Sequence, residues 1–177
     1  MIETPRLLLR RWRDADAIPF HAMGQDAEVM RYLGPPMAMA DCAATVTRMN
    51  AMADDRGTCF WAVEERATGE FIGFCGIKPG PAGTPIEGLP EIGWRLARSA
   101  WGRGVAHEAA LACLARAWAA GTPRVVAITV PANERSWRLM IRLGMRRVPD
   151  GDFDHPVLAE NDPLRRHLSY AIDRPRG

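Results

Sequence analysis

A short segment at Trp101–Ala106, with the sequence WGRGVA, has the residue types and spacing of an anion-binding turn. It follows an apolar run that predicts a strand and precedes a longer run that predicts a helix. Gly102 and Gly104 let a ligand approach the backbone closely, and the free N–H groups of a helix's first turn attract negative charge. The segment therefore predicts a site for a phosphorylated ligand; a tight turn that merely needs small residues is the alternative.

Better-known phosphate motifs do not fit this segment. A dinucleotide-binding Rossmann turn has a third glycine where this chain has His107, and a P-loop ends in Gly-Lys-Ser or Gly-Lys-Thr. No such tripeptide occurs in the chain. The spacing therefore disfavours a nucleotide-dependent Rossmann enzyme.

The elements that must position this turn follow from apolar periodicity and from end signals such as Gly57, Gly121 and Gly144. Strands are expected near residues 7–9, 59–65, 70–77, 91–97, 124–130, 145–148 and 166–172. Helices are expected from Asp14 or Asp16, over about 26–33, from a cap at Asp41 to about 55, from the glycine-containing turn to about 120, and from a cap at Asn133 to 143. This order predicts an α/β fold with a mixed sheet covered by helices on both faces.

Composition narrows the class of protein. The length of 177 residues, without a linker or repeat, predicts one domain over residues 1–177. A net charge of +2 with scattered arginines argues against nucleic acid as a partner. No stretch approaches the ~20 apolar residues of a membrane span and none has the pattern of a secretory leader, so we expect a cytoplasmic protein that binds no membrane. The four cysteines lack a CxxC spacing and are expected to be buried thiols without disulfides.

A polar group precedes and enters the last expected strand: Asp152, Asp154, His155 and His167. Their spacing matches no common set of metal ligands, and we expect no metal. Two other interpretations stay open. The group could form an acidic rim that attracts a cationic amine, or a turn before Pro156 that is stabilised by aspartate side chains.

Four motifs in a fixed order resemble a known family: Glu91–Leu96 (EIGWRL), Trp101–Ala109 (WGRGVAHEA), Asn133–Ser136 (NERS) and Leu143–Met145 (LGM). The chain resembles the GNAT superfamily of acetyl-CoA-dependent N-acetyltransferases, and in particular its branch of ribosomal-protein N-terminal acetyltransferases. Glu3–Arg10 (ETPRLLLR), Glu28–Tyr32 (EVMRY) and Asp152–Pro156 (DFDHP) match that branch too, so the resemblance covers essentially the whole chain.

The resemblance implies a central, mostly antiparallel sheet of six to seven strands with a splayed parallel pair, and acetyl-CoA as cosubstrate. By this resemblance, the backbone of Trp94, Arg95 and Leu96 would pair with the pantetheine arm, and the Asn133 side chain would hydrogen-bond the cofactor nearby. Ser136 would lie close to the sulfur. The pyrophosphate would be held by the backbone N–H groups of Gly102, Arg103, Gly104, Val105, Ala106 and His107.

Two positions depart from the pattern of the family. The phosphate loop often begins with Gln or Arg, whereas here it begins with Trp101, so phosphate binding would depend on backbone N–H groups and on Arg103. The superfamily often has a tyrosine seven residues after the asparagine as proton donor to the departing thiolate, and that position is Met140 here. The resemblance to this branch implies that a serine takes this role instead, and Ser136 is the matching residue.

Glu91 is the candidate general base. An amine must lose its proton before it can attack a thioester, and a carboxylate can take that proton directly or through a water. A carboxylate in an otherwise apolar strand is costly unless it is used or paired. The alternative is that Glu91 lies in water at the end of the strand or pairs with an arginine of another element. Arg95 shares its face but stands about 13 Å away along the strand.

Together these observations predict an acetyl-CoA-dependent N-acetyltransferase that moves the acetyl group to a primary amine by direct attack in a ternary complex. The expected acceptor is a protein or peptide N-terminus or a small-molecule amine, and a homodimer is compatible with the sequence. The alternative is a non-catalytic acyl-CoA-binding regulatory module. Acceptor specificity is expected to reside in three irregular segments, residues 34–41, 79–90 and 152–163.

Overall fold

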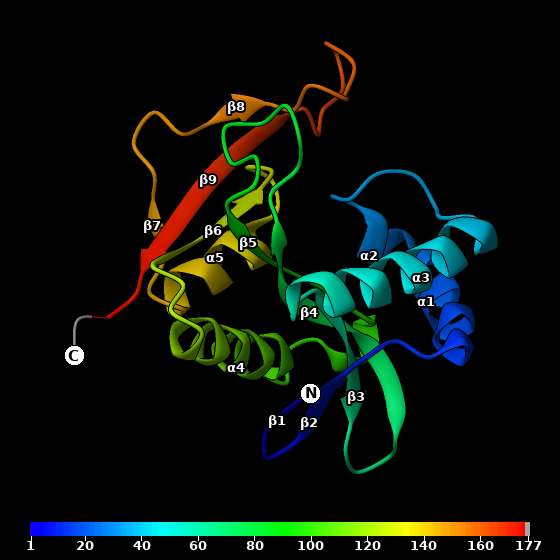
Figure 1. The fold of residues 1–177 in the computed structure, drawn as a ribbon. Coiled ribbons are helices and arrows are strands. Elements are labelled where there is room, and N and C mark those ends of the chain that lie inside the picture. The colour runs from blue at the N-terminus through cyan, green and yellow to red at the C-terminus, as the bar shows by residue number, and fades with distance from the viewer. Residues whose placement is uncertain (176–177) are drawn as a thin grey trace.

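The structure is a computed structural model that describes residues 1–175. A sheet of nine strands forms its centre (Figure 1). The strands are β1 (Ile2–Glu3), β2 (Leu7–Arg10), β3 (Phe60–Glu65), β4 (Glu70–Pro79), β5 (Pro90–Leu96), β6 (Arg124–Thr129), β7 (Arg146–Arg147), β8 (Phe153–Asp154) and β9 (Arg166–Asp173). They lie in the order β1-β2-β3-β4-β5-β6-β9-β7, and β8 pairs with β9.

The pair formed by β5 and β6 is parallel, whereas the other strand pairs are antiparallel. β5 and β6 are joined where Glu91 lies opposite Val126, and from there β5 continues along β4 while β6 continues along β9. The expected mixed sheet with a splayed parallel pair is therefore confirmed. The strand count exceeds six to seven because β1, β7 and β8 have two residues each.

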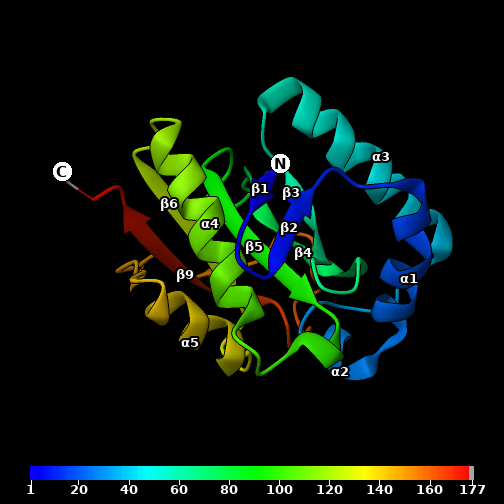
Figure 2. The ribbon, with the colours of Figure 1, turned by 90° about the horizontal axis from the view of Figure 1, so that it is seen from below.

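Helices cover both faces of the sheet, as expected. α1 (Ala17–Gln25), α2 (Ala27–Met30) and α3 (Met39–Arg56) gather on one side, and α4 (Val105–Ala119) and α5 (Glu134–Arg142) on the other (Figures 1 and 2). Two 3-10 turns, η1 (Asp14–Asp16) and η2 (Arg98–Ala100), come before α1 and α4. Alternation along β4 shows the two faces: Cys75 contacts Cys113 of α4, whereas the neighbouring Phe74 packs against Phe20 of α1.

Local signals located most helix ends correctly. Asn133 caps α5 with its side chain, and Gly57 ends α3 in the left-handed conformation. The expected cap at Asp41 is wrong, because α3 begins at Met39 after Ala38 and Asp41 lies in the first turn. An acidic residue is favourable in a first turn as well as at a cap, so the two positions give the same sequence signal.

The four cysteines are buried and free, which confirms the expectation. Burial raises the pKa of Cys59 to about 12, so its thiol stays protonated near neutral pH. Cys75 lies on β4 against Cys113 of α4, in the core between the sheet and that helix. The cysteines therefore act as small apolar residues in the interior.

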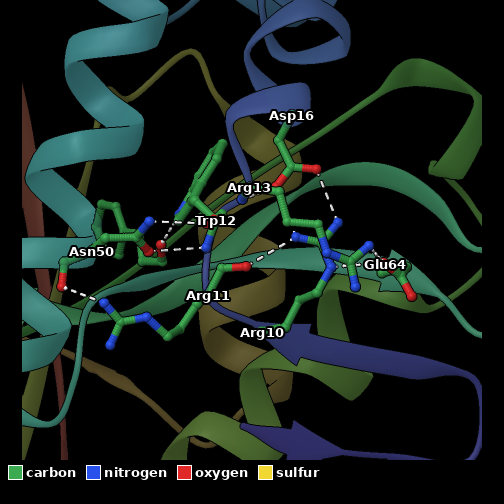
Figure 3. A network of polar contacts seen from close by, with 8 residues as sticks. Arg10, Arg11, Trp12, Arg13, Asp16, Asn50 and Glu64 are labelled. Carbon is green, nitrogen blue, oxygen red and sulfur yellow. Dashed lines mark hydrogen bonds and ion pairs between the residues drawn. The ribbon is translucent and has the colours of Figure 1, made fainter.

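A buried ion-pair network ties β2 to the first helices (Figure 3). The Arg10 guanidinium donates to both carboxylate oxygens of Asp16, at 2.7 and 2.9 Å, and to Oε2 of Glu64 at 2.6 Å. Beside it, the Asn50 side chain of α3 accepts from the Trp12 N–H at 3.0 Å and donates to the Trp12 carbonyl at 2.9 Å. These bonds hold η1 and α3 against the sheet.

Candidate active site

The turn between β5 and α4 leaves backbone N–H groups available. Gly102 and Gly104 have φ of +73° and +76°, a region that side chains disfavour, which explains the glycines. Gly104 is the N-cap of α4 and no side chain caps the helix there. The first-turn N–H groups, from Val105 to His107, have no intrahelical acceptor and point outward from the positive end of the helix dipole. The turn therefore has free N–H groups of the kind that the predicted phosphate site requires.

The acidic residue of that first turn does not occupy these N–H groups. Glu108 accepts hydrogen bonds from the Thr4 hydroxyl at 2.6 Å, from the Arg6 N–H at 3.0 Å and from Arg6 Nε at 2.6 Å. Burial alone would raise the pKa of Glu108, but these hydrogen bonds from Thr4 and Arg6 hold it below its ordinary value. The carboxylate is thus fixed toward the N-terminal segment.

The basic side chains around the turn differ from expectation. The Arg103 guanidinium forms an ion pair with Glu65 of β3 through Nη2, which holds part of the side chain toward that strand. Arg135, in the first turn of α5, instead lies with its guanidinium 4.5 Å from the centre of the Trp101 ring. The Trp101 ring is itself fixed by a 2.9 Å hydrogen bond from Nε1 to the Leu96 carbonyl. Arg135 therefore places positive charge beside the turn, a role that its sequence position did not indicate.

The strand before the turn has one open edge. Trp94, Arg95 and Leu96 pair with Cys75, Phe74 and Gly73 of β4. On the side of β6, within residues 1–175, the ladder with β5 consists of the Glu91–Val126 pair alone. Backbone groups on that side of β5 after Glu91 are therefore free of a strand partner, which is the arrangement that the expected pantetheine pairing needs.

Asn133 and Ser136 lie together at the start of α5. Asn133 Oδ1 accepts from the Ser136 N–H at 3.3 Å, which leaves the Nδ2 amide of Asn133 and the Ser136 hydroxyl without a protein partner within the described chain. Both residues are partly exposed. Met140 is only 2% exposed and packs in the core, so this position contributes no polar group to the site.

Glu91 lies at the other end of β5 and is 9% exposed. Its Oε2 accepts a 2.6 Å hydrogen bond from Nζ of Lys78, the residue opposite it on β4. Lys78 also donates to the Pro79 carbonyl at 3.1 Å and lies 5.1 Å from the centre of the Phe60 ring. The partner is therefore a lysine of the neighbouring strand, whereas the sequence suggested an arginine, water or substrate. Oε1 is left without a hydrogen bond inside residues 1–175.

Two of the expected specificity segments meet near Glu91. A side chain at Gly83 would come within 3.5 Å of Pro156, and Figure 1 shows the β4–β5 loop beside β8 and the start of β9. The His155 ring lies 5.1 Å from the His167 ring, measured between ring centres, with the two planes tilted by 51°, and its buried Nδ1 has no hydrogen-bond partner. Burial lowers the pKa of His155 and His167 lowers it further, while the charge of Glu91 raises it.

The aspartates of the polar group have other partners. Asp152 forms an ion pair with Arg147, and Asp154 pairs with Arg166 at 3.3 Å. Within residues 1–175, no three His, Cys, Asp or Glu side chains are grouped as a metal ion would require. The described helices also include none with the length and apolar character needed to cross a membrane.

Comparison with known proteins places these features in a family. The acetyltransferase (GNAT) domain family matches residues 6–146. The uncharacterized protein YkkB of Bacillus subtilis is 34% identical over 146 residues, which cover 80% of this chain and 83% of YkkB.

Solved structures share the fold over nearly the whole chain. A GNAT-family acetyltransferase from Bacillus anthracis superposes with a TM-score of 0.80 at 24% identity and covers 98% of both chains. A ribosomal-protein-S5-alanine acetyltransferase from Vibrio fischeri superposes with a TM-score of 0.74 at 14% identity, over 97% of this chain and 95% of that one. The chain therefore belongs to the GNAT acetyltransferase family and is an acetyl-CoA-dependent acetyltransferase.

Proposed function

We propose that the protein transfers the acetyl group of acetyl-CoA to a primary amine by direct attack in a ternary complex. The observation that carries the proposal is the open edge of β5 leading into the uncapped first turn of α4. An extended pantetheine arm can pair with such an edge as a strand would, and a pyrophosphate can accept from the N–H groups at the helix start.

Different residues bind different parts of acetyl-CoA. The backbone of Trp94, Arg95 and Leu96 pairs with pantetheine, and Asn133 donates from Nδ2. The backbone from Gly102 to His107 holds the pyrophosphate, and Arg135 supplies a cationic side chain beside it, while Arg103 is paired with Glu65. Acetyl-CoA supplies a thioester whose acetyl group an amine can accept.

The proton path uses Glu91 and Ser136. Glu91 receives the proton of the acceptor's ammonium group at Oε1, while Lys78 holds Oε2 and fixes the orientation of the carboxylate. A backbone N–H on the open edge of β5 donates to the acetyl oxygen as negative charge develops there. The Ser136 hydroxyl donates to the departing sulfur, a role that a methionine at position 140 cannot fill.

An acceptor screen at fixed acetyl-CoA tests this proposal, with release of free thiol as the readout. We expect turnover with at least one class among short peptides with free N-termini, amino acids, polyamines and aminoglycosides. Calorimetry should show one acetyl-CoA site per chain. Binding without turnover across the whole screen would support the regulatory module instead, and absence of binding would contradict both functions.

A further inference from the structure

The side chain of Arg95 has a role that the pairing of its backbone does not explain. The guanidinium lies 5.7 Å from the centre of the Phe20 ring and 5.5 Å from that of Phe74. Its Nη1 lies 3.0 Å from the Met37 sulfur. Two rings and a thioether therefore hold the group on the α1 side of the sheet, where cation–π attraction replaces part of its hydration.

No anion within residues 1–175 neutralises this charge. Nε of Arg95 is buried without a hydrogen-bond partner. Burial lowers the pKa of Arg95 to about 10, and the one group that acts to raise it is the Cys42 thiol. Burial also raises the pKa of Cys42, so at neutral pH that thiol is uncharged while the guanidinium stays protonated. A half-buried cation without a counter-charge is unfavourable for folding, and a role in binding would explain why it is present.

The position of Arg95 supplies that reason. Gly93 and Glu91 share its face of β5, and Glu91 stands about 13 Å away along the strand. The Phe60 ring lies over Gly93 between the two residues, so an acceptor whose amine faces Glu91 can reach Arg95 only with a group several bonds away from that amine. Met37, which contacts the guanidinium, belongs to segment 34–41, where acceptor specificity was expected.

We propose that Arg95 binds a carboxylate of the acceptor, so that the substrate is a primary amine that also carries a carboxylate group. A guanidinium presents parallel N–H donors that match the two oxygens of a carboxylate, which the surrounding rings cannot do. The carboxylate comes from an acidic side chain close to a peptide N-terminus, or from an amino acid whose carboxylate is several bonds away from its amine. Polyamines and aminoglycosides lack it and would be repelled. This inference rests on the proposed function.

The test compares matched acceptors on the full-length protein. The panel contains amino acids with their carboxamides, and short peptides that differ by an acidic or an amide side chain in the second residue. Each pair is assayed with wild type, with Arg95→Met, which removes the charge but keeps bulk, and with Arg95→Lys, which keeps the charge but loses the fork. Arg142→Met, exposed on α5, is the matched control.

We expect wild type to prefer the carboxylate form by about tenfold or more in kcat/KM, mostly through KM. Arg95→Met should abolish the preference, Arg95→Lys should keep part of it, and Arg142→Met should keep all of it. Arg95→Met should also melt no lower than wild type, because it removes an unpaired buried charge; a purely structural arginine would lower the melting temperature. The arm that shows the preference, amino acid or acidic peptide, identifies the source of the carboxylate.

Equal use of both forms by wild type, or a preference that survives in Arg95→Met, would overturn the inference. The inference would also be overturned if no acid in the panel were acetylated better than its amide and none stabilised the CoA-bound protein better than its amide. Calorimetric binding of acetyl-CoA to the same samples separates the two levels. If wild type does not bind acetyl-CoA, the proposed function itself is contradicted. If wild type binds acetyl-CoA but uses the acid and amide forms equally, only the role of Arg95 is contradicted.

Discussion

Arg10 is buried and Arg95 is half-buried, and the groups that surround the two guanidinium groups are opposite in kind. Arg10 meets two carboxylates, and the hydrogen bonds that it donates to Asp16 hold its pKa above the ordinary value despite burial (Figure 3). Arg95 meets two aromatic rings and a methionine, and burial lowers its pKa to about 10. We call the Arg10 charge closed, because carboxylates of the protein neutralise it. We call the Arg95 charge open, because it has no anionic partner within residues 1–175.

The difference separates the scaffold from the site. A closed pair cannot exchange its partner for a ligand without breaking the local fold, so the Arg10 network serves to position η1, α3 and β3. An open charge is held in place by packing but keeps its hydrogen-bonding capacity for an incoming group. Glu91 is intermediate, because one of its oxygens is bound to Lys78 and the other is free.

Breaking the closed network should have the largest effect. Asp16→Asn removes the charge that faces Arg10 and leaves the guanidinium with Glu64 alone in the interior. We expect a loss of about 3–5 kcal/mol in the free energy of unfolding, measured by urea denaturation. Asp54→Asn, which breaks the exposed Arg11–Asp54 pair, is the control and should cost little. Equal losses for the two variants would contradict the structural role assigned to the network.

Glu91→Gln tests the carboxylate that has one oxygen bound to Lys78 and one oxygen free. We expect kcat to fall by about 100-fold near pH 7, or about 2.7 kcal/mol. The loss should shrink at alkaline pH, where the acceptor amine loses its proton to water without help. Glu70→Gln, exposed at the far end of β4, is the control. A loss that is the same at both pH values would reject Glu91 as the base.

A carboxylate introduced beside Arg95 should neutralise its charge and compete with an acceptor carboxylate. Met37→Glu places a carboxylate beside Arg95, since the Met37 sulfur already lies 3.0 Å from Nη1. We expect the acceptor KM to rise by about tenfold, or about 1.4 kcal/mol, and the melting temperature to rise as well. Met37→Gln keeps the size without the charge and should change both quantities less. An unchanged KM in Met37→Glu would mean that no acceptor group uses Arg95.

The smallest effect is expected for Glu108, whose carboxylate is bound by Thr4 and Arg6 in the first turn of α4. Because hydrogen bonds hold the pKa of Glu108 below its ordinary value of 4.5, its contribution to stability is present above that pH and is lost as the pH falls through the depressed pKa. Glu108→Gln should therefore destabilise the protein at pH 7 by about 1 kcal/mol or less, and the difference from wild type should narrow by pH 3. A difference that is constant with pH would argue against this linkage.

Features set by local chemistry were predictable from the sequence. The glycines at 102 and 104, the Asn133 cap and the C-terminal ends of α3 and α5 depend on residues close together in the chain, so their signals are complete within a short window. The splayed parallel pair came from resemblance to a family. β1 and β8 were missed, because a two-residue strand has no periodicity and forms only through pairing with a distant neighbour.

The partners of the site residues were not predictable, because they depend on strand register and on segments far apart in sequence. Lys78 faces Glu91 only through the register of β4 against β5, and the long loop between these strands does not fix that register. The ion pair of Arg103 with Glu65 and the contact of Met37 with Arg95 join residues 38 and 58 positions apart. Residue type alone could not distinguish the closed arginine from the open one.

The most direct test of the account is a titration of the protein with acetyl-CoA, followed by backbone amide chemical shifts. If the open edge of β5 and the first turn of α4 bind the cosubstrate, the largest changes should fall at residues 94–96 and 102–107, with little change across Arg10–Asp16. Saturable binding with the largest changes elsewhere, or no binding, would contradict the assignment of the open groups to the substrate site.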